Sequence, residues 1–112
     1  MHIDIVNGEV VVKLSWLETI LSLRRKVVLP ISKIQSVSLE KPKVKWALRV
    51  GTGVPFYFYA GLFYTDFGRE FWYRKVNREH LTIVMKNNKP FRRVSLTIDN
   101  PERMYSLIKK RL

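Results

Sequence analysis

The sequence predicts a mainly β fold, a small barrel of roughly six or seven short strands covered by one C-terminal helix. Four glycines between positions 51 and 68 punctuate two aromatic-rich runs, 54–64 and 67–73, which is typical of strands joined by enforced turns. Residues 101–111 instead carry apolar side chains at helical spacing. The chain of 112 residues is long enough for one hydrophobic core and too short for two, so we expect a single domain over residues 1–112.

The N-terminal third predicts short strands interrupted by one short helix. Val10, Val12 and Leu14 recur at every second position, which indicates a half-buried first strand. Residues 15–18 then fit a capping box, and the apolar spacing that follows predicts a helix over 16–23. Two β-prone segments, each followed by a proline, predict further short strands over residues 27–29 and 34–40.

A central hairpin and two later strands follow. Thr-Asp-Phe-Gly at 65–68 predicts the turn of the hairpin, and Gly-Thr-Gly-Val-Pro at 51–55 predicts an irregular start to its first strand. Apolar residues alternate again over 81–85 and 94–98, and Lys-Asn-Asn-Lys-Pro at 86–90 predicts the turn that joins these segments. We therefore expect the last two strands of the barrel there.

The C-terminal helix is expected over residues 101–111. Asp99 and Asn100 offer side-chain oxygens as caps, Pro101 suits the first helical turn, and the basic residues 109–111 complement the helix dipole. One apolar stripe, which we expect to lie against the sheet, consists of Met104, Leu107, Ile108 and Leu112.

The chain is strongly basic and contains no cysteine. Lys and Arg number 21 against 9 Asp and Glu, a net charge of +12, which favours nucleic acid, anionic lipid or an acidic protein as partner. The lack of cysteine excludes disulfides, thiolate catalysis and cysteine-ligated zinc. The N-terminus does not have the pattern of a signal peptide, and the longest apolar run, about 11 residues, is shorter than the ~20 of a membrane-spanning helix. We therefore expect a cytoplasmic protein that meets a membrane only peripherally.

Few residues are available for catalysis. Of the two histidines, His2 is terminal, and His80 follows Glu79 in the expected turn between two strands, where a solvated pair is the simpler interpretation. The sequence contains no His-x-x-x-His pair, no Gly-x-Ser-x-Gly elbow and no phosphate-binding Gly-x-x-x-x-Gly-Lys loop. We expect a binding protein rather than an enzyme, with no catalytic residue, no metal site and no cofactor.

A series of short motifs extends over nearly the whole chain. They are Trp16-Leu17-Glu18, Leu23-Arg24-Arg25, Val27-Val28-Leu29-Pro30-Ile31-Ser32-Lys33-Ile34, Ser36-Val37, Gly51-Thr52-Gly53-Val54-Pro55, Gly61, Gly68-Arg69-Glu70-Phe71-Trp72 and Ile98-Asp99-Asn100-Pro101-Glu102. In this order they resemble prokaryotic PH-like (pleckstrin-homology-like) domain proteins. The resemblance implies a strongly bent β-barrel that is closed at one end by the C-terminal helix, in a family whose prokaryotic members mostly have no assigned ligand.

Two groups of basic residues are the candidate ligand-binding sites. PH domains that bind phosphoinositides carry a basic cluster at the loop between their first two strands, and the matching connection here holds Lys13, Arg24, Arg25 and Lys26. The helix predicted inside that loop and the missing Arg-x-Arg spacing depart from the family pattern, and cations at a helix C-terminus also complement its dipole. The second group, around the central hairpin, consists of Arg69, Arg74, Lys75 and Arg78. We expect the partner to be an anionic lipid surface or a protein.

Nucleic-acid binding and protein association are the alternatives. Aromatic and basic residues lie together over 69–75, as a stacking platform for single-stranded nucleic acid requires. The segment lacks an RNP-like pattern, and rings on both faces of a strand are also what a thin barrel wall needs, so we expect Trp72 to be mainly structural. The surplus of aromatic residues over 56–63 leaves open an exposed patch for a partner protein or a second copy of the chain.

Overall fold

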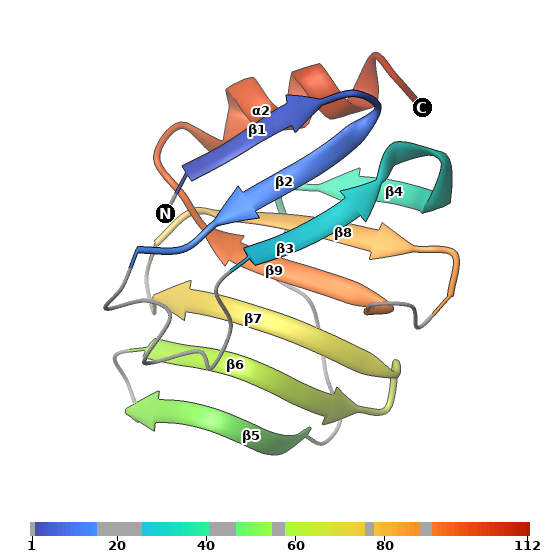
Figure 1. The fold of residues 1–112 in the computed structure, drawn as a ribbon. Coiled ribbons are helices and arrows are strands. Elements are labelled where there is room, and N and C mark those ends of the chain that lie inside the picture. The colour runs from blue at the N-terminus through green and yellow to red at the C-terminus, as the bar shows by residue number, and fades with distance from the viewer. Residues whose placement is uncertain (1, 16–25, 41–46, 55–57, 76–77, 88–90) are drawn as a thin grey trace.

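The computed structural model describes residues 2–15, 26–40, 47–54, 58–75, 78–87 and 91–112, with only the backbone described for 47, 49–54 and 58 (Figure 1). Nine strands, one 3-10 helix and one α-helix lie in these ranges. They are β1 His2–Val6, β2 Glu9–Lys13, β3 Lys26–Pro30, η1 Ile31–Lys33, β4 Ile34–Ser38, β5 Ala47–Val54, β6 Phe58–Thr65, β7 Arg69–Lys75, β8 His80–Met85, β9 Arg93–Thr97 and α2 Pro101–Lys109. The mainly β composition and the C-terminal helix predicted from the sequence are confirmed.

The described strands form two sheets. β1, β2 and β3 make a three-stranded antiparallel sheet, and the other six strands form a larger sheet in the order β4-β8-β9-β7-β6-β5. Neighbours in the larger sheet run antiparallel except β7 and β9, which are parallel. In Figure 1 the small sheet lies in front of the upper part of the large sheet, and α2 lies at the top, where it contacts β4 and β8.

The described strands do not close into the single bent barrel that the sequence predicts. β4 and β5 lie at the two outer edges of the six-stranded sheet, and the small sheet keeps its own strand order. Consecutive strands do not all pair with each other, because β9, rather than β8, pairs with β7, and a parallel pair needs a crossover connection. Periodicity in a sequence identifies strands and leaves their partners unspecified, which is why the sequence did not predict this pairing.

One hydrophobic core lies between the two sheets and the helix. Val10 and Val12 alternate with more exposed residues along β2 and are fully buried, as the period of two in a half-buried strand requires. The large sheet contributes Phe71 to the same cluster, and α2 contributes Met104 and Ile108. Burial of each such side chain stabilises the fold by about 1.5–3 kcal/mol, so the core holds all three layers together.

β1 is a strand that the sequence analysis did not predict. It pairs with β2 along its whole length, from His2 opposite Lys13 to Val6 opposite Glu9. Asn7 and Gly8 form the turn between the two strands, with φ of 51° and 76°. Asn-Gly is a favoured two-residue hairpin turn because both positions accept positive φ, so this dipeptide is the signal that identifies the hairpin.

Three local predictions in the chain have different outcomes. The 65–68 turn is confirmed by backbone hydrogen bonds of 2.9 and 3.2 Å between Thr65 and Gly68, with Gly68 at φ 139°. The irregular start predicted at 51–55 is wrong for residues 51–54, because they continue β5 in unbroken register with β6. The helix predicted over 16–23 lies outside the described residues.

The C-terminal helix ends earlier than the predicted residue 111, at Lys109. Met104 and Ile108 are buried, which confirms the centre of the predicted apolar stripe. Leu112 is 51% exposed because it follows the end of the helix. Asn100 occupies the N-cap position in a left-handed conformation and makes no side-chain capping bond, so its predicted role as a cap is wrong. Within the described residues, no helix is long and apolar enough to cross a membrane.

Candidate functional site

The first predicted basic group is brought together in part. Lys13 and Lys26 lie directly opposite each other in the register of β2 and β3, and both are exposed. His2 lies opposite Lys13 on the other side, so these residues form one row across the small sheet. Like charges directly opposite each other on neighbouring strands destabilise the pair, which makes this row a place where an anion would be favourable. Arg24 and Arg25 lie outside the described residues.

The four residues of the second predicted basic group differ in their burial and in their position along and after β7. Arg69 and Lys75 occupy the two ends of β7, which at about 3.3 Å per residue places them roughly 20 Å apart. Arg74 is buried, whereas Lys75 is exposed on the opposite face of the strand. Arg78 follows β7 and is exposed. These four residues therefore do not converge on one ligand.

Four basic residues instead form a row at one end of the molecule, which we call the basic rim. The Lys86 N–H donates to the Lys33 carbonyl at 2.8 Å, and the Arg92 N–H donates to the Arg69 carbonyl at 2.6 Å. A third bond, from the Met85 N–H to the Arg92 carbonyl at 2.7 Å, joins these two pairs. The basic rim thus runs from η1, across the β8–β9 connection, to the start of β7. It consists of Lys33, Lys86, Arg92 and Arg69.

Aromatic rings position the arginines of the rim. The Arg69 Cζ lies 5.4 Å from the centroid of the Phe91 ring, and the Arg92 Cζ lies 4.9 Å from that of Phe67. Arg93 stacks on the same Phe67 ring at 4.3 Å. A cation over a ring face within about 6 Å is attracted by the ring quadrupole. Stacking holds these guanidinium groups in place and uses none of their N–H donors.

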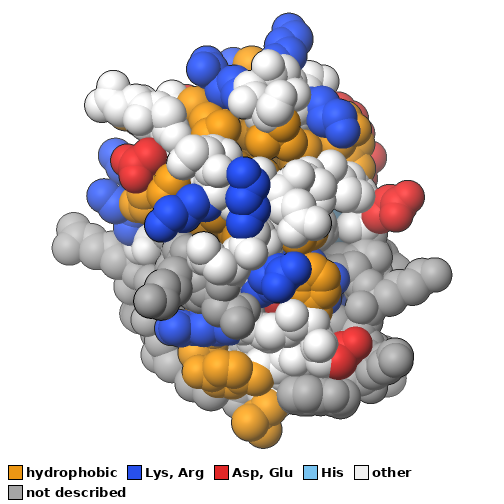
Figure 2. Space-filling model, turned by 90° about the vertical axis from the view of Figure 1, so that its right-hand side faces the viewer, with side chains coloured by type: hydrophobic (Ala, Val, Ile, Leu, Met, Phe, Trp, Pro, Cys, Tyr) orange, Lys and Arg blue, Asp and Glu red, His pale blue; other side chains and the backbone are white. Residues whose placement is uncertain are grey.

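Exposed apolar side chains border the basic rim. Leu48, Tyr64 and Arg69 are successive neighbours in the register of β5, β6 and β7, and Leu48 is 64% exposed and Tyr64 39% exposed. The β1–β2 turn lies at the same end, because the Ile31 N–H donates to the Gly8 carbonyl at 2.9 Å. Figure 2 views this end of the molecule and shows Lys and Arg side chains spread over the face, interspersed with hydrophobic ones. The surface is therefore both cationic and partly apolar.

A buried charged cluster lies next to the rim, on the face of the large sheet away from the core. The Glu70 carboxylate is fully buried and accepts two bonds from Arg93, Nε to Oε1 and Nη2 to Oε2, each of 2.7 Å. The indole Nε1 of Trp72 donates to Oε1 at 2.8 Å, and the Thr65 hydroxyl donates to Oε2. Phe63 stacks on Trp72 with ring centroids 4.0 Å apart. This cluster fixes Arg93 beside Phe67, the ring that also holds Arg92.

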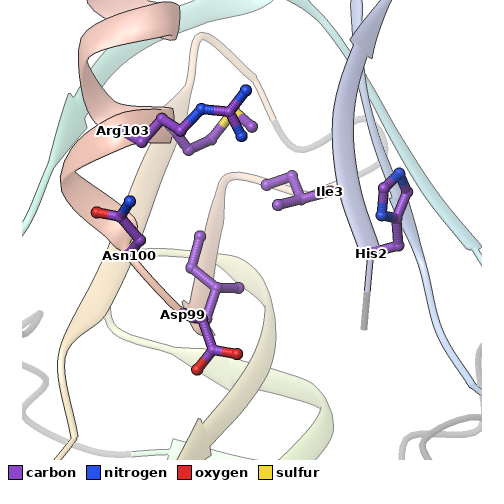
Figure 3. Close-up of a pocket in the computed structure, with 7 residues that line it drawn as sticks. His2, Ile3, Asp99, Asn100 and Arg103 are labelled. Carbon is purple, nitrogen blue, oxygen red and sulfur yellow. The ribbon is translucent and has the colours of Figure 1, made fainter.

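A cavity of about 230 Å³ opens between β1 and the start of α2 (Figure 3). Its ionisable side chains are those of His2, Asp99 and Arg103, all of them exposed. In Figure 3 Arg103 extends toward Ile3, whereas the Asp99 carboxylate and His2 point in other directions. The charged groups of the cavity therefore do not converge as a catalytic set would.

The prediction that His80 lies in a solvated turn is wrong. His80 is the first residue of β8 and is 8% exposed, because the strand starts one residue earlier than the apolar alternation indicates. No group of three or more His, Asp and Glu residues in the described part of the chain is arranged to hold a metal ion.

Three members of the rim, Lys33, Lys86 and Arg92, are not among the site residues predicted from the sequence. They come from three separate segments and are joined by pairing between η1, the β8–β9 connection and β7, so no local spacing reveals them. The signal that does exist is Phe91-Arg92-Arg93, where an aromatic residue precedes two cations directly after a turn. No protein-family model, curated protein or solved structure matches this chain.

Proposed function

We propose that the protein is a non-enzymatic binding module that docks reversibly on an anionic membrane surface. The observation that supports this function is the basic rim, a row of cations beside the exposed Leu48 and Tyr64. A lysine or arginine near an anionic leaflet contributes about 1 kcal/mol. Lys33 and Lys86 are exposed and Arg69 and Arg92 are half-buried, so the four supply at most about 4 kcal/mol, which corresponds to roughly millimolar affinity. Apolar side chains that enter the headgroup region add to this. Binding is therefore expected to be reversible and sensitive to salt.

Anionic lipid is favoured over single-stranded nucleic acid by the burial of the aromatic residues on β7. Stacking of bases requires exposed ring faces, but Phe71, Trp72 and Tyr73 are 0%, 4% and 8% exposed. Trp72 is packed between Phe63 and the guanidinium of Arg74. Its predicted structural role therefore fits the packing, and the three rings of β7 offer no accessible face on which a base would stack. A lipid surface requires charge and shallow apolar contact only.

The proposal includes a relationship to PH-like domains. The order of sequence motifs resembles that family, and a C-terminal helix packed on the strands is in keeping with an opened form of its barrel. In that family the basic cluster near Lys13 and Lys26 is the expected ligand site. These residues lie at the end of β2 that is remote from the β1–β2 turn, whereas the rim lies at the turn end. The family pattern and the basic rim therefore place the lipid contact at opposite ends of the molecule, and we propose the rim.

Sedimentation with vesicles tests the proposed function. We expect the protein to sediment with vesicles of phosphatidylserine in phosphatidylcholine at low salt, and to remain in solution with phosphatidylcholine alone. Raising the salt concentration should release it, because exposed charges are screened over a Debye length of about 3 Å at 1 M salt, compared with about 30 Å at 0.01 M. Absence of binding at low salt, or binding that is unchanged at high salt, would contradict the proposal.

A further inference from the structure

Arg74 is a buried cation that the proposed membrane contact does not use. Its side chain is 9% exposed, and its Cζ lies 4.2 Å from the centroid of the Trp72 ring. The Nη1 atom is buried without a hydrogen-bond partner. A buried guanidinium in this state carries a large desolvation cost.

The buried carboxylate of the same face is already saturated. Glu70 Oε1 accepts from Arg93 Nε and Trp72 Nε1, and Oε2 accepts from Arg93 Nη2 and the Thr65 hydroxyl. A carboxylate has about four acceptor positions, so none remains for a further donor. Glu70 and Arg93 neutralise each other, and Arg74 is left as an excess positive charge within this cluster.

Ser95 provides a second polar group without a partner on the same face. It lies directly opposite Trp72 in the parallel register of β7 and β9. Its side chain is fully buried, and its Oγ makes no hydrogen bond within the described residues. Trp72 is therefore flanked by a guanidinium whose Nη1 lacks an acceptor and by a serine hydroxyl without a partner.

We propose that Arg74 and Ser95 form an internal site that binds a small oxyanion, a phosphate or carboxylate group, beside the Trp72 ring. The planar guanidinium presents paired N–H donors that match two oxygens of such a group, and the serine hydroxyl supplies another donor. The bound anion neutralises the excess charge of the cluster. This site is separate from the basic rim in both its residues and its ligand contacts.

The electrostatic setting of Arg74 agrees with an anion site. Burial lowers the pKa of its guanidinium from the ordinary value; Glu70 and Tyr59 act in the opposite direction, and Arg93 adds to the lowering. Arginine nevertheless keeps its proton in proteins. The cost of burying this charge is therefore relieved by recruiting an anion and not by releasing a proton.

Thermal unfolding of the full chain with inorganic phosphate or acetate, each compared with sodium chloride at matched ionic strength, tests the site. We expect one of the two anions to raise the Tm of the wild type in proportion to the logarithm of its concentration, because it binds only the folded state. Arg74→Met keeps an unbranched apolar chain against Trp72 and removes the charge. Because this variant loses the charge-assisted hydrogen bonds, its affinity for the anion should fall about tenfold or more. The Tm of Arg74→Met without anion should equal or exceed that of the wild type, because an unpaired buried charge has been removed.

Lys75→Met is the matched control, because it removes the same charge from the next residue, which is exposed on the opposite face. It should respond to the anion as the wild type does. If Arg74→Met does not fold, a ¹H–¹⁵N spectrum of the wild type tests the site instead. The indole N–H signal of Trp72 should then shift on addition of the anion. An equal effect of chloride on the wild type, an unaltered response in Arg74→Met, or an indole signal that does not move would overturn the site.

The oxyanion could be a free ion or part of a lipid headgroup, and vesicle sedimentation of folded Arg74→Met distinguishes these two sources. Retained binding to phosphatidylserine vesicles identifies a free ion as the occupant. Lost binding, together with a lost response to soluble anion, identifies a lipid headgroup. If the wild type does not bind vesicles but its Tm responds to phosphate, the internal site stands and the proposed membrane function fails.

Discussion

Glu70 is the residue on which the charged face of the large sheet depends. It is fully buried and bonds to Arg93, Trp72 and Thr65. A buried ion pair contributes little beyond an apolar pair of the same shape, because both charges must be desolvated. Removal of one partner is different, since the other charge then stays buried without compensation. The pair therefore fixes the position of Arg93 more than it adds to net stability.

Glu70→Gln should lower the free energy of unfolding by about 3–5 kcal/mol, because it leaves Arg93 buried and unpaired. Urea denaturation followed by circular dichroism measures this difference. Glu79→Gln is the control, because it makes the same chemical change at an exposed position and should alter stability by less than about 0.5 kcal/mol. Similar midpoints for the two variants would show that Glu70 is not an essential partner of Arg93.

At the scale of elements, α2 closes one side of the core. Ile108 is fully buried and Met104 is 6% exposed, and both belong to the hydrophobic cluster that includes the strands of both sheets. The helix contacts β4 and β8, the strands at one edge of the large sheet. Its nine residues are fewer than the ~12–15 that an isolated helix needs in water. Packing on the sheet therefore stabilises the helix, and the helix in turn covers the core.

Ile108→Ala should cost about 2–5 kcal/mol as a large-to-small change at a fully buried position. The measurement is the midpoint of thermal or chemical unfolding, with Leu112→Ala as a control at an exposed position beyond the end of the helix. Leu107 is only partly buried against the core, so Leu107→Ala should cost less than Ile108→Ala. Equal stability of Ile108→Ala and the wild type would mean that α2 does not cover the core.

The elements that could be predicted from the sequence are those with strong local patterns. Period-two alternation identified β2, β8 and β9, and Pro101 with the following apolar stripe identified α2. The Asn-Gly dipeptide before β2 is a further local signal, because it identifies the turn of the β1–β2 hairpin. Strand partners could not be predicted, because the parallel β7–β9 pair depends on contacts between segments distant in sequence. The basic rim could not be predicted for the same reason: strand pairing alone brings Lys33, Lys86 and Arg92 together.

At the scale of the whole molecule, exposed positive charge lies at both ends of the small sheet. One end carries the basic rim with the exposed Leu48 and Tyr64 beside it. The other end carries Lys13 and Lys26, paired across β2 and β3. Both ends would attract anions at long range, because the net charge of +12 acts over the whole surface. The rim has the exposed Leu48 and Tyr64 beside it, which can enter a headgroup layer, so docking is expected to be oriented.

The most direct test compares two double charge reversals in vesicle sedimentation, Lys33→Glu with Lys86→Glu in the rim and Lys13→Glu with Lys26→Glu at the other end. All four lysines are exposed, and both variants change the net charge equally, so long-range attraction is matched between them. The rim variant should lose about tenfold or more in affinity for phosphatidylserine vesicles, because each well-placed cation contributes about 1 kcal/mol. The other variant loses only the long-range attraction that both variants lose, so its loss of affinity should be clearly smaller. Equal losses in both, or a larger loss on reversing Lys13 and Lys26, would contradict docking through the basic rim.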